Sequence, residues 1–345
     1  MRAAADYLDG SAHAWHRGLV ELRDGRIRLT PDVDTSHLPR IRGVVTGGFT
    51  DAHVHLQLVD PAALADSVLG RVIDLGGDPA ALSAVHHSAE NERSGPESPR
   101  TADTHAISAE FCALAFAGAF LTPPGGYPSD RAWAPRGSVR EIADADAAAT
   151  AVAEMQDAGA TRIKVASNST AGPVFTDDMF TTIVQLAASH GLPVVAHAEG
   201  PGEAQRVARL GARTLAHAPF TERLDEDELR RMRDLDVSWI STLGIHGGET
   251  LAIAIDNVRR FHAIGGTIQY GTDMGNGPTP VDLNAGEITA LRKAGIDGME
   301  LLRALAPTDP LHRDSRLLFF PGASPDDADP LIARPLTAAD LENPR

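Results

Sequence analysis

The stretch Gly-Gly-Phe-Thr-Asp-Ala-His-Val-His-Leu, residues 47–56, contains the feature around which the rest of this chain is organised. It is typical of a short β-strand and carries two histidines, His53 and His55, separated by one valine. Side chains at positions i and i+2 of a strand lie on the same face, so both imidazoles should point the same way. Two strand histidines can also bond each other or the backbone, so their meaning depends on polar residues elsewhere.

Three other apolar runs also end in a polar side chain. Val-Val-Ala-His ends at His197, Thr-Leu-Ala-His ends at His217, and Ile-Gln-Tyr-Gly-Thr-Asp ends at Asp273. If these runs are parallel strands, their polar ends meet at the face where barrel active sites are built. A buried imidazole without a partner costs about 1 to 3 kcal/mol, whereas one divalent ion satisfies several such groups. The pattern predicts a metal centre; imidazole and carboxylate suit zinc, with iron, manganese or nickel as alternatives.

Lys164 lies in the apolar segment Thr-Arg-Ile-Lys-Val-Ala. Lys293 is the only other lysine in the sequence, and the remaining permanently charged basic residues are all arginines. A buried amine can lose its proton, which a guanidinium does not do. A neutral amine can react with carbon dioxide to give a carbamate, whose two oxygens can bridge two ions. Lys164 therefore favours two metals over one, the alternative being an ordinary lysine paired with a carboxylate.

From Gly48 onward, β-rich runs alternate with Ala-rich amphipathic stretches, as in parallel strands joined by crossover helices. We expect strands at residues 51–57, 71–75, 109–118, 161–166, 193–197, 213–217, 237–243 and 267–272. We expect helices at residues 143–158, 177–190, 202–210, 225–235, 250–264 and 283–294. Several should end at a glycine in the left-handed conformation, namely Gly159, Gly191, Gly211 and Gly295. The alternation predicts an α/β fold, a (β/α)8 TIM-like barrel over residues 48–307.

Both chain ends differ from this core. Apolar and polar residues alternate around Asp24-Gly25, which is a strong hairpin signal. Residues 316–320 form another β-like run, followed by turns rich in proline and aspartate. We therefore expect a small β-sandwich subdomain made of residues 1–47 and 308–345.

Some residues lie outside the metal pattern. Residues 91–104 are polar and interrupted by proline, so we expect a surface loop. We also expect His86, His87 and His105 at the surface. Cys112 is the only cysteine, which excludes an internal disulfide, and its apolar neighbours predict a buried structural thiol.

The composition argues against some classes of partner. A net charge of -16 and a pI near 5.2 disfavour a nucleic-acid backbone or an anionic membrane surface as partner. No apolar run approaches the ~20 residues of a membrane helix, and no secretory signal is evident, so we expect a cytoplasmic protein. These properties suit an enzyme for a small molecule, and a homodimer is an open possibility.

The six polar residues resemble the metal centre of the amidohydrolase superfamily, in its binuclear carboxylated-lysine type. The set is His53, His55, Lys164, His197, His217 and Asp273. Flanking motifs, such as Gly-Phe-Thr-Asp-Ala-His and Ala-His-Ala-Glu-Gly, resemble the branch of imidazolonepropionases and Xaa-Pro dipeptidases, and the resemblance runs from about residue 17 to residue 307. It implies that the histidine pair and the final aspartate hold one ion, that the two later histidines hold the other, and that the carbamylated lysine bridges both.

The resemblance implies hydrolysis of a C–N bond in an amide, a cyclic amide or a dipeptide-like small substrate. Hydroxide held between the ions would attack the carbonyl, and Asp273 would carry the proton to the leaving nitrogen. Three alternatives remain open. They are a single-metal deaminase of a heterocyclic base, a phosphoester or lactone hydrolase, and a scaffold protein on a barrel without catalysis.

Loops after the strands should supply the substrate contacts. His246 lies between apolar residues and two glycines just beyond the seventh strand. Tyr127, Arg131 and Arg136 lie in a long loop after the third strand, where they contact substrate or only fold the loop. Glu199 lies two positions after a proposed ligand, so it should point to the same side and support that ligand.

Overall fold

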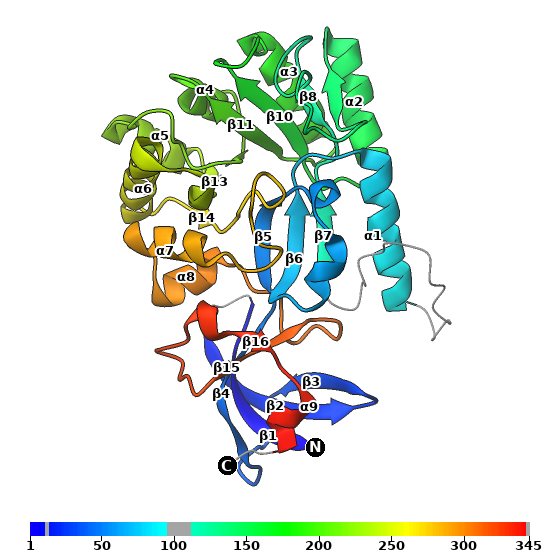
Figure 1. Ribbon diagram of the computed structural model, residues 1–345, viewed down its shortest axis with the longest axis vertical. Coiled ribbons are helices and arrows are strands. Elements are labelled where there is room, and N and C mark those ends of the chain that lie inside the picture. Colours follow the sequence, from blue (N-terminus) through cyan, green and yellow to red (C-terminus); the bar gives the residue numbers. More distant parts are fainter. Residues whose placement is uncertain (11–13, 95–111, 343–345) are drawn as a thin grey trace.

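The barrel wall consists of parallel strands in two hydrogen-bonded groups (Figure 1). The computed structural model describes residues 1–10, 14–94 and 112–342. One group contains β5 (Phe49–Val54), β6 (Leu69–Asp74) and β7 (Ala113–Phe116). The other follows the order β14-β13-β12-β11-β10-β8-β9. Its strands are β8 (Phe120–Thr122), β9 (Val139–Glu141), β10 (Ile163–Asn168), β11 (Val194–Glu199), β12 (Thr214–Leu215), β13 (Ser238–Ile240) and β14 (Ile268–Gln269).

Hydrogen bonds between the two groups close the wall. On one side, the Ala52 amide of β5 donates to the Tyr270 carbonyl just after β14 at 3.0 Å. On the other side, the Thr161 amide before β10 donates to the Phe116 carbonyl at the end of β7 at 2.9 Å. This confirms the (β/α)8 barrel, and it brings the carboxyl ends of all the strands to one face.

Helices cover the outside of this wall, as the alternating pattern predicts (Figure 1). They are α1 (Pro79–Ser94), α2 (Ala145–Asp157), α3 (Asp177–Ser189), α4 (Glu203–Arg209), α5 (Glu226–Asp234), α6 (Gly248–Ala263), α7 (Ala285–Lys293) and α8 (Gly298–Ala304). Short 3-10 helices lie in the loops: η1 (Leu56–Leu58), η2 (Pro61–Ala65), η3 (Leu243–Ile245) and η4 (Pro330–Ile332). The four glycines expected at helix ends all have positive φ, from 70° to 104°.

The third strand differs from its prediction. Instead of one strand over residues 109–118, the structure has β7 and then β8, separated by a bend at Gly118 with φ of 75°. A Cβ at Gly118 would come within 2.3 Å of Met155 Sδ, so only glycine fits. The bend lets β8 pair with both β10 and β9, and β9 was not predicted. Residues 109–111 of the prediction lie outside the described residues.

The surface-loop prediction for residues 91–104 is wrong at its start. Helix α1 continues to Ser94, because no proline or glycine interrupts the chain before Gly95-Pro96 in the sequence. The remainder of the expected loop lies outside the described residues.

A separate six-stranded sheet combines both chain ends in the order β16-β15-β4-β1-β2-β3 (Figure 1). Its strands are β1 (Arg2–Leu8), β2 (Trp15–Arg23), β3 (Arg26–Pro31), β4 (Arg40–Gly47), β15 (Leu317–Pro321) and β16 (Arg334–Pro335), and α9 (Ala338–Glu342) follows them. The expected hairpin joins β2 to β3 through Asp24 and Gly25, both with positive φ, which matches the twist of the strands. Strand β1 was not predicted, because its run of alanines lacks β-branched residues.

Two groups of buried apolar side chains support the strands that carry the polar residues. Small aliphatic side chains fill one cluster: Ala52, Ile73, Leu75, Ala117, Val195, Ala216 and Ile240. The larger core lies between strands and helices, where Trp239 and Phe261 stack with centroids 3.9 Å apart. Within the described ranges, no helix combines the length and apolar character needed to cross a bilayer.

Two predictions about single side chains are settled here. Cys112 is buried, as expected. His86 is not a free surface residue, since its Nδ1 lies 3.0 Å from the Leu114 carbonyl and the ring is half-buried against the barrel. His87 is exposed, and His105 lies outside the described residues.

Candidate metal centre

The six predicted donor residues converge on one cavity at the carboxyl ends of the strands. His53 lies on β5, Lys164 on β10 and His197 on β11, and the others lie one to four residues after the ends of β5, β12 and β14. All six are buried, with at most 7% of any of them exposed. The cavity has a volume of about 240 Å³, and all six side chains line it. Residues far apart in the sequence thus line one cavity, because the carboxyl ends of the strands meet at this face of the barrel.

Three of the histidines are anchored through Nδ1. His53 Nδ1 lies 2.8 Å from the Ala216 carbonyl, and His55 Nδ1 lies 3.0 Å from the Gly76 carbonyl. His217 Nδ1 lies 2.8 Å from Thr242 Oγ1. A carbonyl oxygen accepts a hydrogen bond, so Nδ1 of the first two donates, and in the neutral ring Nε2 is left with its lone pair. This is how a protein presents an imidazole to a metal ion.

At the centre, two buried donor atoms face each other without a hydrogen bond. His53 Nε2 and Asp273 Oδ1 are 3.2 Å apart, yet neither atom has a hydrogen-bond partner among the described residues. Because His53 Nδ1 donates to the Ala216 carbonyl, Nε2 of the neutral ring carries a lone pair, so two acceptor atoms face each other with no proton between them. Donor atoms of His53, His217 and Asp273 all lie within 4.8 Å of one another. This donor set fits a divalent metal ion.

Charge and burial shift the pKa of most of these groups toward the form that binds a metal, whereas burial of His55 is outweighed by contact with Asp273, which raises the pKa of His55. Burial lowers the pKa of His53 and of His217 well below 6.5, so both imidazoles are neutral. Burial acts to raise the pKa of Asp273, but His53 and His55 outweigh it and hold that pKa well below 3.8. Burial lowers the pKa of Lys164 to about 7, against the opposing charges of Asp273 and Asp74. An amine with this pKa is largely neutral at slightly alkaline pH.

Two buried aspartates that the sequence analysis did not single out brace the histidine pair. Asp51 accepts hydrogen bonds from the His53 amide at 3.0 Å and from Thr272 Oγ1 at 2.5 Å. Asp74 accepts from the Leu56 amide at 2.7 Å and from the Gly76 amide at 2.9 Å. Each is an acid within an otherwise largely apolar strand, which is the sequence signal that could have identified them.

The catalytic candidate Asp273 has its own support. Asn276 Nδ2 donates to Asp273 Oδ2 at 2.8 Å, which leaves Oδ1 toward the histidines. Asp273 also has a left-handed backbone, with φ of 56°. This conformation is uncommon outside glycine, and aspartate is among the residues that tolerate it best.

The cavity wall includes three of the five other predicted residues. Tyr127, His246 and Glu199 line the cavity, and Glu199 Oε2 lies 3.2 Å from His197 Nε2. Burial lowers the pKa of His246 to about 4. Arg136 does not line the cavity and is exposed, because the chain turns away at Gly137 to enter β9. Arg131 is also exposed, with its guanidinium carbon 5.7 Å from the Tyr127 ring centroid.

The wall also contains residues that sequence reasoning missed. They are Phe120, Trp133, Phe220, Ile245 and Asn276. Aromatic and aliphatic side chains in loops carry no signal that separates them from ordinary packing residues, so only the folded chain identifies them.

A family model described as the amidohydrolase family matches residues 44–304. The match spans most of the chain and contains all six donor residues. The chain belongs to the amidohydrolase family. The family's metal-dependent hydrolysis of C–N bonds agrees with the buried donor set. No curated protein sequence matches this chain.

Solved structures support the same fold for this amidohydrolase. The chain is similar to an ochratoxinase from A. niger, with a TM-score of 0.67, 14% identity, and coverage of 96% of this chain and 93% of that one. It is similar to a Xaa-Pro dipeptidase with bound methionine, with a TM-score of 0.66, 15% identity, and 95% of each chain covered. A prolidase complexed with N-methylphosphonate-L-proline gives a TM-score of 0.63 and 18% identity, covering 95% and 96%.

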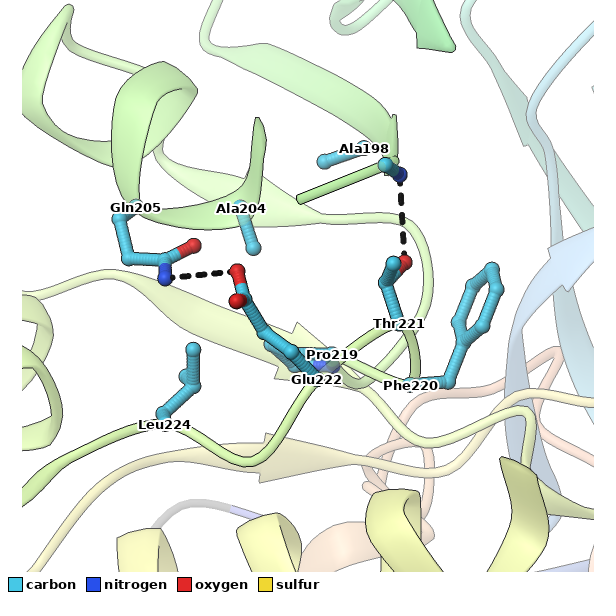
Figure 2. A pocket seen from close by; sticks show the side chains of 9 residues that line it. Ala198, Ala204, Gln205, Pro219, Phe220, Thr221, Glu222 and Leu224 are labelled. Carbon is cyan, nitrogen blue, oxygen red and sulfur yellow. Dashed lines mark hydrogen bonds between the residues drawn. The ribbon is translucent and has the colours of Figure 1, made fainter. Parts of the chain in front are cut away.

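The loop after β12 of the amidohydrolase barrel is held firmly and carries Phe220 to the cavity. Figure 2 shows Glu222 and Thr221 turned toward strand β11 and helix α4. Glu222 Oε1 accepts from the Gly202 amide at 2.6 Å and from Gln205 Nε2 at 3.0 Å. Behind this loop lies a cavity of about 10 Å³, enough for one water molecule. Phe220 is therefore presented by a loop with several buried hydrogen bonds.

Proposed function

We propose that this protein is a two-metal amidohydrolase that hydrolyses an amide, cyclic amide or dipeptide-like C–N bond in a small molecule. The main support is the pair of buried atoms His53 Nε2 and Asp273 Oδ1, which lie 3.2 Å apart without hydrogen-bond partners. Nitrogen and oxygen donors of this kind suit zinc, which is the metal we expect. The similarity to a structure named as a Xaa-Pro dipeptidase is in keeping with a dipeptide-like substrate.

In this proposal the six donor residues divide between two ions. His53, His55 and Asp273 would hold one, His197 and His217 would hold the other, and a carbamate on Lys164 would supply oxygen ligands. When bound, two divalent ions would lower the pKa of a water molecule and polarise the scissile carbonyl. The pKa of about 7 supports the carbamate, because only the neutral amine of Lys164 can add to carbon dioxide.

Asp273 carries the proton in the reaction. Its pKa lies well below 3.8, so the group is ionised at neutral pH, and we assign it the role of accepting the proton of the attacking water. It then delivers that proton to the nitrogen as the C–N bond breaks, giving a carboxylic acid and an amine. Asn276 donates to Oδ2 and so fixes the orientation of the carboxylate.

The first test is replacement of the proton carrier. In Asp273→Asn the amide retains one oxygen donor but cannot accept a proton, so turnover should fall by about 10³-fold while some metal remains bound. Turnover measured with the best substrate of a panel of N-acyl amino acids, cyclic amides and dipeptides, together with metal analysis by mass spectrometry, checks this. Activity close to that of the unchanged protein would remove Asp273 from the mechanism.

Metal stoichiometry separates the remaining candidates. Two ions per chain with release of an amine or amino acid supports the amidohydrolase. One ion per chain with release of ammonia from a heterocyclic base supports a deaminase, and a protein that binds no metal after reconstitution supports a scaffold. Hydrolysis of a phosphoester or lactone in preference to all amides would identify the remaining alternative.

A further inference from the structure

Beyond the six donor residues, the cavity wall is largely aromatic. Phe120, Tyr127, Trp133 and Phe220 line it. Tyr127 stacks on His197 with ring centroids 5.1 Å apart, and Trp133 lies 6.1 Å from Tyr127 and 6.2 Å from Phe120. Aromatic rings at such separations attract one another and offer flat apolar surfaces. The wall therefore suits an aryl or other flat apolar group.

The same wall offers a ligand little positive charge. Its other side chains are Glu199, Ile245, His246 and Asn276. His246 is neutral at pH 7, since burial lowers its pKa to about 4. In the described part of the chain, the only lysine or arginine that lines the cavity is Lys164, which is one of the six donors.

At the aromatic part of the wall, away from the two proposed ions, a free carboxylate on a ligand would be poorly satisfied. It would lose water and meet aromatic rings and the carboxylate of Glu199 instead of a guanidinium. The nearby arginines of the loop after β8 do not change this. Arg131 is exposed and pairs with Asp130 at 3.2 Å, and Arg136 is exposed and outside the lining.

Part of the wall is also held in position by contacts within the protein, without a ligand. The Phe220 ring lies 4.3 Å from the His246 ring, and its loop is held by Glu222 and Thr221 (Figure 2). A rigid wall selects among ligands more sharply than a mobile one, because less ordering is required on binding.

We propose that the substrate carries an aryl or flat apolar group beside the scissile C–N bond, has neutral polar ends, and lacks a free carboxylate. Anilides, aryl-substituted cyclic amides and amide-capped residues belong to this class. N-acyl amino acids and dipeptides with a free C-terminus do not. The inference rests on the proposed function for the bond that is broken, and it narrows the substrates of that function.

Binding of a matched pair tests the charge preference. We expect the purified metal-containing protein to bind N-acetyl-L-phenylalaninamide about tenfold or more tightly than N-acetyl-L-phenylalanine in calorimetry at pH 7.5, because the two differ only in carrying a neutral amide or a charged carboxylate at one end. Equal or tighter binding of the acid, or no binding of the amide at millimolar concentration, overturns the inference.

Variants test which side chains cause the preference. Ile245→Lys places a cation in the wall and should lower the amide-to-acid ratio about tenfold. Leu331→Lys adds the same charge at an exposed position on η4 and should leave the ratio unchanged. Trp133→Ala should weaken the binding of N-acetyl-L-phenylalaninamide about tenfold and the binding of N-acetyl-L-alaninamide less than about threefold. Equal weakening of both ligands overturns the aryl part of the inference.

Metal content keeps the two proposals apart. Two ions per chain without a preference for the amide would overturn this inference and leave the proposed function standing. A preserved preference in a protein that binds no metal would overturn the proposed function alone.

Discussion

Lys164 is the residue on which the two-metal proposal depends most. It is 1% exposed and faces the same cavity as five histidines, with its Nζ 5.7 Å from the centroid of the Phe120 ring. A permanently charged amine among these groups would be costly, and its pKa of about 7 reflects that cost. A buried neutral lysine beside an aspartate has a chemical use that a buried arginine lacks.

Replacing Lys164 with methionine should remove the bridge between the ions while preserving much of the volume. We expect the bound metal to fall below two ions per chain and turnover to fall by at least about 100-fold, since even residues that only support metal ligands contribute 10- to 100-fold. Mass spectrometry of the metal and turnover of the best panel substrate measure this. Lys293→Met, which changes the other lysine at an exposed position on α7, is the matched control and should keep both values. Two ions and full turnover in the Lys164 variant would contradict the bridge.

Among the elements, the loop between β13 and α6 links the centre to a helix behind it. Thr242 contacts His217 Nδ1 and has a left-handed backbone with φ of 40°, which is strained for a β-branched residue. Glu287 on α7 is fully buried, and its Oε2 accepts from the Gly244 amide at 2.5 Å. The helix thereby holds the loop that orients one metal ligand and carries His246.

Glu287 should also make stability depend on pH. Burial raises its pKa to about 7 from 4.5, so the folded state favours the protonated form. This contribution is complete below pH 4.5 and is lost as pH rises through about 7. In Glu287→Gln the dependence disappears. The unchanged metal-free protein should therefore lose more free energy of unfolding than the variant between pH 4.5 and pH 8, on the order of 3 kcal/mol.

Urea unfolding of both proteins at several pH values measures this difference. Glu249→Gln, at an exposed position in the first turn of α6, serves as the control and should follow the unchanged protein at every pH. Parallel curves for the unchanged protein and Glu287→Gln would show that Glu287 titrates normally in the folded state.

For the molecule as a whole, we propose a division into residues 1–47 with 308–345 and residues 48–307. Strand β4 ends at Gly47 and β5 begins at Phe49, so the chain passes from one sheet to the barrel within two residues. A Cβ at Gly47 would lie 1.8 Å from the Thr308 carbonyl oxygen. The chain therefore enters the barrel after Gly47 and leaves it before Thr308 at two points that are in direct contact. Such close contact favours unfolding of both parts together.

Arg316 should be a main contributor to this coupling. It lies just before β15 and is 7% exposed, and its guanidinium donates to the Ser67 carbonyl and to the Ala65 carbonyl, the latter at 2.7 Å. Arg316→Ala should lower the free energy of unfolding by about 3 kcal/mol, because hydrogen bonds from charged groups are lost and buried carbonyls remain. Urea unfolding followed by circular dichroism measures it, with the exposed Arg313→Ala as control. A loss below about 1 kcal/mol would show that other contacts couple the two parts.

The linear sequence already determined the barrel and the donor residues of the candidate centre. Short apolar runs that end in histidine or aspartate identify strands and their carboxyl ends, because side-chain periodicity and burial are local properties of the chain. Parallel strands then have to meet at one face, so six donors separated by up to 220 residues were predictable as neighbours.

Only the tertiary structure decided the rest of the site. Asp51, Asp74 and Asn276 support the donors through contacts that no periodicity encodes, and Arg136 points away because of a turn at Gly137. The aromatic wall joins side chains from separate loops, whose paths depend on what each loop packs against. Hydrogen bonds and packing between residues distant in sequence set these positions, so they appear only once the chain has folded.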